Sequence, residues 1–345
     1  MNLDVCIVTY DSAADLPGCL RSVADLEVEA LQVSIVDNAS RDDSADVAAR
    51  WAQELDLPVK IQRRSANTGF AAGMNDAIAA TGAPWVLVLN PDARPRPDYV
   101  RRLLARAQAC DRAGLRVGAL TGRLIRPENG GVTTLDACGM VLRRTWRHLD
   151  RGSGEPDDGR LAEAQQVFGA TGAAALYRRE ALLDVSIRDG DEVLVFDPLF
   201  HSYREDAELC FRLHERGWSV VYEPAARCEH RRAVLPANRR HTSARVNLHS
   251  LKNRYLLRAY HETGATLWRT LPFALARDLA ALLWVLVAER SSLAAYVWLW
   301  RQRRRWWARA RCIRRRRIVS TSVVARWFSH PSLPLPDPPN PLEPT

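Results

Sequence analysis

Two adjacent carboxylates, Glu205 and Asp206, open a short segment with the periodicity of an amphipathic helix, which Gly217 ends. A strand-like run, SVVYEP, follows it, and His230 closes the stretch. Backbone N–H groups point outward from the first turn of a helix, so acids there can simply complement the helix dipole. A carboxylate at the same place can also accept a proton from a substrate hydroxyl. These residues alone leave both interpretations open.

A second set of polar residues follows the strand-like runs of the first 115 residues. Apolar runs of strand length cover 3–9, 31–37, 59–62 and 85–92. Helical segments lie between them, and this alternating order predicts a doubly wound, mostly parallel sheet with right-handed crossovers. Ligands of such sheets bind beyond the carboxyl ends of the strands. The polar residues near these ends are Thr9, Tyr10, Asp37, Asn67, Asn90 and Asp92. Each alone fits a turn or a cap, whereas the set together predicts a ligand site.

The types of these residues indicate a kind of chemistry. Asp92 follows a buried strand and suits a hard divalent cation, because Mg²⁺ takes one or two carboxylates plus substrate phosphates. A lone histidine such as His230 is more often structural than a ligand, and the glycine-bearing loop at 67–78 lacks the lysine of a P-loop. A nucleotide-sized crevice, a metal carboxylate and a distant acid together suggest a transfer reaction. A nucleotide diphosphate would leave, and the acid would accept a proton from the incoming hydroxyl.

Five motifs follow one another along the chain: VTYDSAADLPGCLRSV, VDNASRDDS, NTGFAAGMNDAI, VLNPDA and FDPLFHSYREDAELCFRLHERGWSVVYEPAARCEH. In order and spacing they resemble the successive motifs of family 2 glycosyltransferases, and they are most similar to the bacterial rhamnosyltransferase-like branch. The resemblance covers roughly residues 3–260. It implies a GT-A fold and inverting transfer of a sugar from a nucleotide-sugar donor. By likeness to that branch, the sugar would be L-rhamnose from dTDP-L-rhamnose, and the acceptor a hydroxyl of a lipid-linked or cell-surface glycan.

The same resemblance implies a role for each matching residue. Asp206 would be the general base, with Glu205 beside it toward the acceptor. Asp92 and His230 would hold a divalent cation, Mg²⁺ or Mn²⁺. The positions that would bind the nucleotide sugar are Thr9, Tyr10, Asp37, Asn67, Gly73, Asn75, Asn90 and Asp92. The family's DxD motif reads Asn-Pro-Asp here, so a neutral residue, Asn90, takes the place of the first aspartate. Whether the metal is strictly required therefore stays open.

Basic residues are concentrated near the C-terminus. The chain of 345 residues has a net charge of +9, and residues 301–317 hold ten arginines and no acid. Subtracting these ten charges leaves −1 for the rest of the chain. Such a tract binds an anionic partner, either a nucleic acid or an acidic membrane surface. Seven scattered cysteines without a CxxC pair, and the lack of a secretory leader before the first strand, favour a cytosolic setting with reduced thiols.

From about Arg239 the pattern becomes helical and rich in tryptophan. The apolar run 279–288 is only about half of a membrane span, so helices lying in the membrane interface fit better than one spanning helix. We expect residues 279–317 to contact an anionic membrane at its cytoplasmic face, without specific binding of nucleic acid. Three alternatives stay open: a helical subdomain with tryptophans in its core, a basic adaptor that binds nucleic acid through 301–317, and a catalytically silent sugar-nucleotide-binding protein.

The composition divides the chain into three parts. We expect a GT-A catalytic domain over 1–236, with a nucleotide-binding half over 1–115 and an acceptor half over 116–236. A helical, basic, membrane-associating region follows over 237–318. Residues 319–345 are rich in proline, which predicts a disordered tail. The sequence indicates no oligomeric state.

Overall fold

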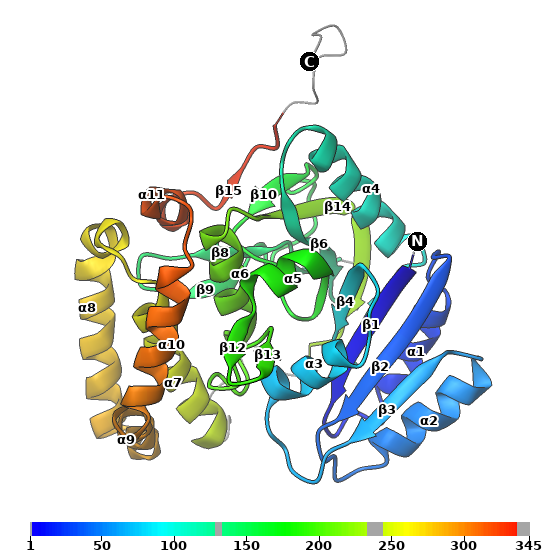
Figure 1. Ribbon diagram of the computed structural model, residues 1–345, viewed down its shortest axis with the longest axis horizontal. Helices are drawn as coiled ribbons and strands as arrows, with labels where there is room; N and C mark the ends of the chain where they lie inside the picture. The colour runs from blue at the N-terminus through cyan, green and yellow to red at the C-terminus, as the bar shows by residue number, and fades with distance from the viewer. Residues whose placement is uncertain (1, 128–132, 233–243, 337–345) are drawn as a thin grey trace, which may run out of the picture.

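The computed structural model describes residues 2–127, 133–232 and 244–336. A large mixed sheet forms its centre, with helices on both faces, and a group of helices from the C-terminal part packs beside the second half of the chain (Figure 1). This arrangement is that of an α/β protein with a C-terminal helical extension, as the sequence predicts.

The first half of the chain alternates strands and helices. Its elements are β1 (Asn2–Thr9), α1 (Leu16–Ala24), β2 (Ala30–Asp37), α2 (Ser44–Glu54), β3 (Val59–Arg63), α3 (Phe70–Ala79) and β4 (Trp85–Leu89). The four strands are parallel neighbours in the order β4-β1-β2-β3, and Thr9 is the register partner of Asp37. Every residue of β4 is buried, because the helices cover both faces of a parallel sheet. The predicted doubly wound parallel sheet is confirmed for this half.

The second half completes the sheet with shorter strands. Its elements are β5 (Ala93–Pro95), α4 (Tyr99–Arg112), β6 (Val117–Ile125), β7 (Leu135–Ala137), β8 (Met140–Leu142), β9 (His148–Asp150), β10 (Gln165–Val167), β11 (Ala174–Arg178), α5 (Arg179–Val185), β12 (Ile187–Asp189), β13 (Glu192–Leu194), α6 (Glu205–Glu215) and β14 (Ser219–His230). β11 lies antiparallel between β4 and β6, and β14 lies parallel to β6. Because β11 runs opposite to β4, it begins where β4 ends, and residues 172–173 reach the carboxyl edge of the parallel strands.

The C-terminal part adds helices and one last short strand. These elements are α7 (Ala244–His261), α8 (Gly264–Val287), η2 (Arg290–Ser292), α9 (Leu293–Arg301), α10 (Arg303–Arg315), α11 (Thr321–Ala325), η3 (Arg326–Phe328) and β15 (Ser332–Leu333). The expectation of a disordered tail is wrong for residues 319–336. Trp327 and Phe328 are buried, the ring centroid of Phe328 lies 4.8 Å from that of Trp146, and β15 pairs with β10. Apolar residues that precede the proline-rich end therefore pack against residues of the expected catalytic domain, such as Trp146. Residues 337–345, and the expected boundary at 236, lie outside the described residues.

Helix α8 is the one described helix that is long and apolar enough to cross a membrane, judged by length and composition only. It is longer than the apolar run that the sequence indicates. Its inner face is polar: Thr270 accepts a hydrogen bond from the Trp146 indole, and Asp278 pairs with Arg254 and Arg258 of α7. Among its exposed apolar residues, six follow one another at helical spacing on the other side: Trp268, Leu271, Leu275, Leu279, Leu282 and Leu286. This stripe, called the apolar stripe of α8 below, makes the helix amphipathic in its folded setting.

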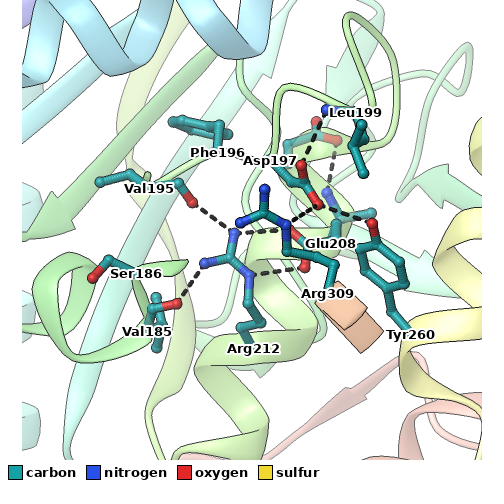
Figure 2. A network of polar contacts seen from close by, with 12 residues as sticks. Val185, Ser186, Val195, Phe196, Asp197, Leu199, Glu208, Arg212, Tyr260 and Arg309 are labelled. Carbon is teal, nitrogen blue, oxygen red and sulfur yellow. Dashed lines mark hydrogen bonds and ion pairs between the residues drawn. The ribbon is translucent and has the colours of Figure 1, made fainter. Parts of the chain in front are cut away.

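A buried polar network joins α6 to the C-terminal helices (Figure 2). Arg212 donates to both carboxylate oxygens of Glu208, at 2.8 and 2.7 Å, and to the carbonyl oxygens of Val185 and Val195, each at 2.6 Å. Asp197 accepts a hydrogen bond from Tyr260 of α7 at 3.0 Å and lies 3.6 Å from Nε of Arg309 of α10. Burial by itself opposes charge on Glu208, but Arg212 and His261 outweigh it and lower the pKa of Glu208 to about 2. The network therefore consists of paired charges.

Replacing Arg212 by Met should destabilise the fold strongly, because Glu208 would remain buried with its main cationic partner removed. We expect a loss of about 3–5 kcal/mol in the free energy of unfolding, measured by urea denaturation. Arg112→Met is the control, since Arg112 is exposed on α4, and it should change stability by no more than about 0.5 kcal/mol. A loss below about 1 kcal/mol for Arg212→Met would show that the network is not held by this pair.

Candidate active site

The ends of β1 and β2 bring the first predicted residues together. The backbone N–H of Asn38 donates to the Thr9 carbonyl oxygen at 2.9 Å, and Asp37 accepts a hydrogen bond from the Ser40 hydroxyl. Tyr10 is 40% exposed, whereas the Thr9 hydroxyl is buried and has no hydrogen-bond partner among the described residues. Thr9, Tyr10 and Asp37 therefore lie at one edge of the sheet, as the parallel topology requires.

The loop before α3 continues this edge. Asn67 accepts hydrogen bonds from the Gly69 N–H at 3.0 Å and from the Asn38 amide at 3.3 Å, which places it next to the end of β2. Gly69 has φ +89°, and a Cβ there would lie 2.3 Å from Nδ1 of His201, so only glycine fits. This close approach joins the loop to the segment that leads into α6.

Two of the predicted nucleotide-binding residues, Gly73 and Asn75, make contacts that support the fold. A Cβ on Gly73 would lie 3.1 Å from both methyl groups of Val8, so this glycine lets α3 pack closely on β1. The Asn75 amide donates to the carbonyl oxygen of Phe196 and accepts from its N–H, both at 2.8 Å. Asn75 therefore fixes the segment after β13 to α3, a role that the sequence did not indicate.

Asp92 and His230 face each other across the carboxyl edge. Nε2 of His230 lies 3.2 Å from Oδ1 of Asp92, and Nδ1 lies 2.7 Å from Oδ2 of Asp136. The pairing of β5 with β14 holds them there, since Ala93 is the register partner of His230. Burial alone would lower the pKa of His230, but the hydrogen bond that its Nδ1–H donates to Asp136 and the nearby Asp92 carboxylate raise it to about 9.

The chemistry of this pair fits a divalent cation. Nε2 of His230 is buried and makes no hydrogen bond of good geometry to any described residue, while Asp136 fixes the ring through the other nitrogen. A carboxylate behind a histidine is the usual support of a metal-binding imidazole. Within the described residues, no group of three or more His, Cys, Asp or Glu side chains could hold a metal ion. Asp92 and His230 would therefore be two protein ligands, and donor phosphates would supply others.

The two carboxyl groups at the start of α6 differ in their hydrogen bonds. Asp206 accepts hydrogen bonds from the N–H groups of Gly172, at 3.2 Å, and Ala207, at 2.7 Å, and these bonds favour its charged form. Burial nevertheless raises the pKa of Asp206 above that of an ordinary carboxyl. Glu205 is buried, its Oε2 has no hydrogen-bond partner among the described residues, and burial together with Asp206 raises its pKa well above the usual range. Of the two carboxyls, Asp206 is therefore the one whose charged form receives hydrogen bonds from the backbone.

Two chains of contacts link Asp206 to the Asp92–His230 pair. In the first, Gly172 donates to Asp206, and the next residue, Ala173, accepts a hydrogen bond from the Asn90 N–H at 2.9 Å, two residues before Asp92. The second runs through Arg232, which contacts Asp136 at 3.1 Å and Asp150 at 2.6 Å. The charge of Asp150 acts on Asp206 and raises the pKa of Asp206 further. The structure therefore links Asp206 to Asn90 and to the Asp136–His230 pair through a few intervening residues.

A family model described as glycosyl transferase family 2 matches residues 4–185, more than half of the chain. The chain belongs to glycosyltransferase family 2. It is therefore an enzyme that transfers a sugar. The family match covers every strand of the parallel half and the Gly172 loop, but it ends before α6.

Curated relatives of this family 2 glycosyltransferase act in the synthesis of bacterial glycans. It is 28% identical to an N-acetylglucosaminyl-diphospho-decaprenol L-rhamnosyltransferase of Mycobacterium tuberculosis in an alignment of 251 residues, with 67% of this chain and 76% of the relative covered. It is 22% identical to a poly-β-1,6-N-acetyl-D-glucosamine synthase of Staphylococcus aureus, over 64% of this chain and 48% of the synthase. Both relatives are named for glycan or glycolipid synthesis.

Solved structures show the same GT-A fold. The mannosyltransferase PcManGT of Pyrobaculum calidifontis, solved with GDP-mannose and Mn²⁺, matches with a TM-score of 0.51 and 18% identity, over 95% of this chain and 88% of the other. TarS of S. aureus, solved with UDP-GlcNAc, matches with a TM-score of 0.55 and 15% identity, over 86% and 79%. At these identities the likeness concerns the fold, and it confirms the predicted GT-A architecture.

Three residues of the site in this family 2 glycosyltransferase were missed by sequence reasoning: Asp136, Asp150 and Arg232. Asp136 and Asp150 lie in β7 and β9, short strands among turn signals, where no periodicity marks a ligand edge. Arg232 follows His230 by two residues in a basic run. Only the pairing of distant strands brings the three side chains together.

Proposed function

We propose that this chain is an inverting glycosyltransferase that moves L-rhamnose from dTDP-L-rhamnose to a hydroxyl of a lipid-linked glycan. The observation that carries this proposal is the Asp206 carboxylate, which the loop at Gly172 and Ala173 links to Asn90, two residues before Asp92. The motif likeness and the rhamnosyltransferase relative, whose name specifies a decaprenol-linked acceptor, support the choice of donor and acceptor.

In this mechanism the acceptor hydroxyl approaches Asp206 and donates its proton to that carboxylate. The acceptor oxygen bonds to the anomeric carbon from the face opposite the nucleotide, and the bond from that carbon to the diphosphate oxygen breaks with its electron pair. The configuration at the anomeric carbon is therefore inverted. A divalent cation at Asp92 and His230 would neutralise the charge on the departing diphosphate. Thr9, Tyr10, Asp37 and Asn67 would bind the base and ribose at the adjoining edge.

A panel of nucleotide sugars tests this function. Release of nucleotide diphosphate is measured for each donor with a polyprenyl-diphosphate N-acetylglucosamine acceptor, and the lipid product is identified by mass spectrometry. We expect dTDP-L-rhamnose to give the largest acceptor-dependent release and a product heavier by one deoxyhexose. Transfer from a UDP-hexose alone would overturn the donor assignment. Binding of nucleotide sugar without transfer from any donor would favour a catalytically silent protein.

The arginine tract is partly used inside the protein, which argues against an adaptor that binds nucleic acid through 301–317. Arg309 pairs with Asp189 at 2.6 Å, and Arg314, Arg316 and Arg317 contact carbonyl or carboxylate groups of α7, α5 and α6. The exposed face of α10 keeps Arg304, Trp307, Arg311 and Arg315 at helical spacing. A mixed aromatic and basic face of this kind suits the headgroup level of a membrane.

We propose that the enzyme is cytoplasmic and binds peripherally to the inner face of the membrane through the apolar stripe of α8 and this basic face. The protein should sediment with vesicles that contain anionic lipid, and less with neutral vesicles. Leu279→Glu should weaken binding by roughly 10-fold or more, because it places a charge where a leucine side chain would enter the interface. Leu183→Glu is a matched control, since Leu183 on α5 is 55% exposed and Leu279 is 53% exposed. Equal binding of both variants would contradict this surface.

A further inference from the structure

The segment that enters α6 has an unusual backbone. Among the described residues, eight non-glycine residues have positive φ, and three of these fall within four positions: His201 at 65°, Tyr203 at 71° and Arg204 at 73°. Residues with a Cβ rarely adopt a positive φ, and several such residues close together persist only where surrounding contacts impose the conformation. Arg204 is the N-cap of α6, so this strained segment directly precedes Glu205 and Asp206.

Asn253 of α7 supplies the contacts that impose this backbone. It is fully buried, and its amide nitrogen lies 2.7 Å from the carbonyl oxygen of Phe200, 2.9 Å from that of Ser202 and 2.7 Å from that of Tyr203. Carbonyl oxygens only accept hydrogen bonds, so the NH₂ group of Asn253 must face them. Lys252 adds a hydrogen bond to the carbonyl oxygen of Leu199 at 2.6 Å.

The other side of the segment is held by α3. The N–H of Ala71 donates to the His201 carbonyl oxygen at 3.0 Å, and the N–H of Phe70 donates to the Ser202 hydroxyl at 3.2 Å. The segment 199–204 thus lies between the nucleotide-binding half and the C-terminal helices. Any relaxation of its backbone would turn the first residues of α6, and with them the Asp206 carboxylate.

We propose that Asn253 is a positioning residue for the transfer reaction: its amide holds the strained segment 199–204 so that the Asp206 carboxylate keeps its place at the start of α6. This role rests on the proposed function of Asp206. Besides the proposed membrane contact, the C-terminal helices would then take part in the reaction, because α7 holds the segment that leads into α6. A residue that only docked α7 would have no reason to bind three carbonyl oxygens within four residues of a strained backbone.

The test compares Asn253→Ala with Leu256→Ala. Leu256 is fully buried one turn further along α7 and does not take part in the hydrogen bonds to segment 199–204. Both variants should lower the melting temperature. Only Asn253→Ala should lower kcat, by about 10- to 100-fold, with the KM for the donor changed less than about threefold, because a misplaced base slows the reaction and leaves donor binding intact. Equal kcat values in the two variants would overturn the proposal.

A double-mutant cycle separates positioning from simple stability. Glycine adopts positive φ without strain, so Tyr203→Gly should make the segment less dependent on Asn253. The loss of kcat on Asn253→Ala should therefore be several-fold smaller in the Tyr203→Gly background than in the native one. An identical loss in both backgrounds would contradict the clamp. Lys252→Met, which keeps the aliphatic stem, replaces Asn253→Ala in the cycle if the latter does not fold.

Hydrogen exchange gives a readout that needs no activity. The amides of residues 201–207 should exchange faster in Asn253→Ala than in the native protein, and at the native rate in Leu256→Ala. Unchanged exchange would overturn the clamp even in an active enzyme. Conversely, a native protein that transfers no sugar while showing the expected exchange would overturn the proposed function and leave the clamp standing.

Discussion

Asp206→Asn should fold as the native protein does and lose about 10²- to 10⁴-fold in kcat, the usual contribution of a positioned general base. The amide keeps the shape of the side chain, and its oxygen can still accept the N–H of Gly172. It can no longer accept the proton of the acceptor hydroxyl. We expect the KM for the donor to stay within a few-fold, because the carboxylate acts on the acceptor side. The measurement is nucleotide diphosphate release at saturating donor and acceptor, with circular dichroism to confirm folding.

Asp111→Asn is the matched control for this experiment, since Asp111 is an exposed aspartate at the end of α4 and should tolerate the change. The pH profile gives a second check. Burial raises the pKa of Asp206, so the charged base is lost, and the rate falls, as pH decreases through a value above that of an ordinary aspartate. That acidic limb should be absent from the residual activity of Asp206→Asn. A larger loss for Glu205→Gln than for Asp206→Asn would transfer the role of base to Glu205.

Asp92→Ala should remove the effect of metal on donor binding and lower kcat/KM by about 100-fold or more, since a metal ion commonly contributes several kcal/mol to stabilising a departing oxygen. Titration calorimetry with the nucleotide diphosphate measures this directly. The native protein should bind it more tightly with Mg²⁺ or Mn²⁺ than with a chelator, and Asp92→Ala should bind it equally under both conditions. Binding of the nucleotide base should survive, because the ends of β1 and β2 are untouched.

A graded comparison strengthens this experiment. Asp136 contacts Nδ1 of His230, whereas Asp92 lies by the other ring nitrogen, so Asp136 would support a metal-binding imidazole, and Asp136→Asn should weaken metal affinity by only about 10- to 100-fold. Asp98→Asn is the control: Asp98 is the N-cap residue of α4 and pairs with Arg102 of the same helix, so this change should leave metal affinity unchanged. A metal effect that persists in full in Asp92→Ala would show that the Asn-Pro-Asp motif does not bind the ion.

Much of the active site could be predicted from local sequence. The alternation of apolar runs and helical segments places Thr9, Asp37, Asn90 and Asp92 at the ends of strands, and parallel strands necessarily bring those ends to one edge. The helix that Glu205 opens was likewise visible, because its apolar residues recur at helical spacing and a glycine ends it. These features depend on residues that are near one another in the sequence, and the spacing of apolar residues therefore reveals them.

The sequence by itself therefore determined the parallel half of the sheet, the edge at which the candidate site lies and the start of α6. Tertiary structure alone decided that Asn75 contacts the segment after β13. It also decided that Asp136 and Arg232 connect the imidazole of His230 with the Asp150 carboxylate. The contacts of Asn253 with the strained segment before α6 are a third such case. Tertiary structure also decided that residues 319–336 pack, since the burial of Trp327 and Phe328 depends on partners far away in the chain. The physical reason is the same in each case: a hydrogen bond or contact between distant residues depends on strand order and register, which no local pattern encodes.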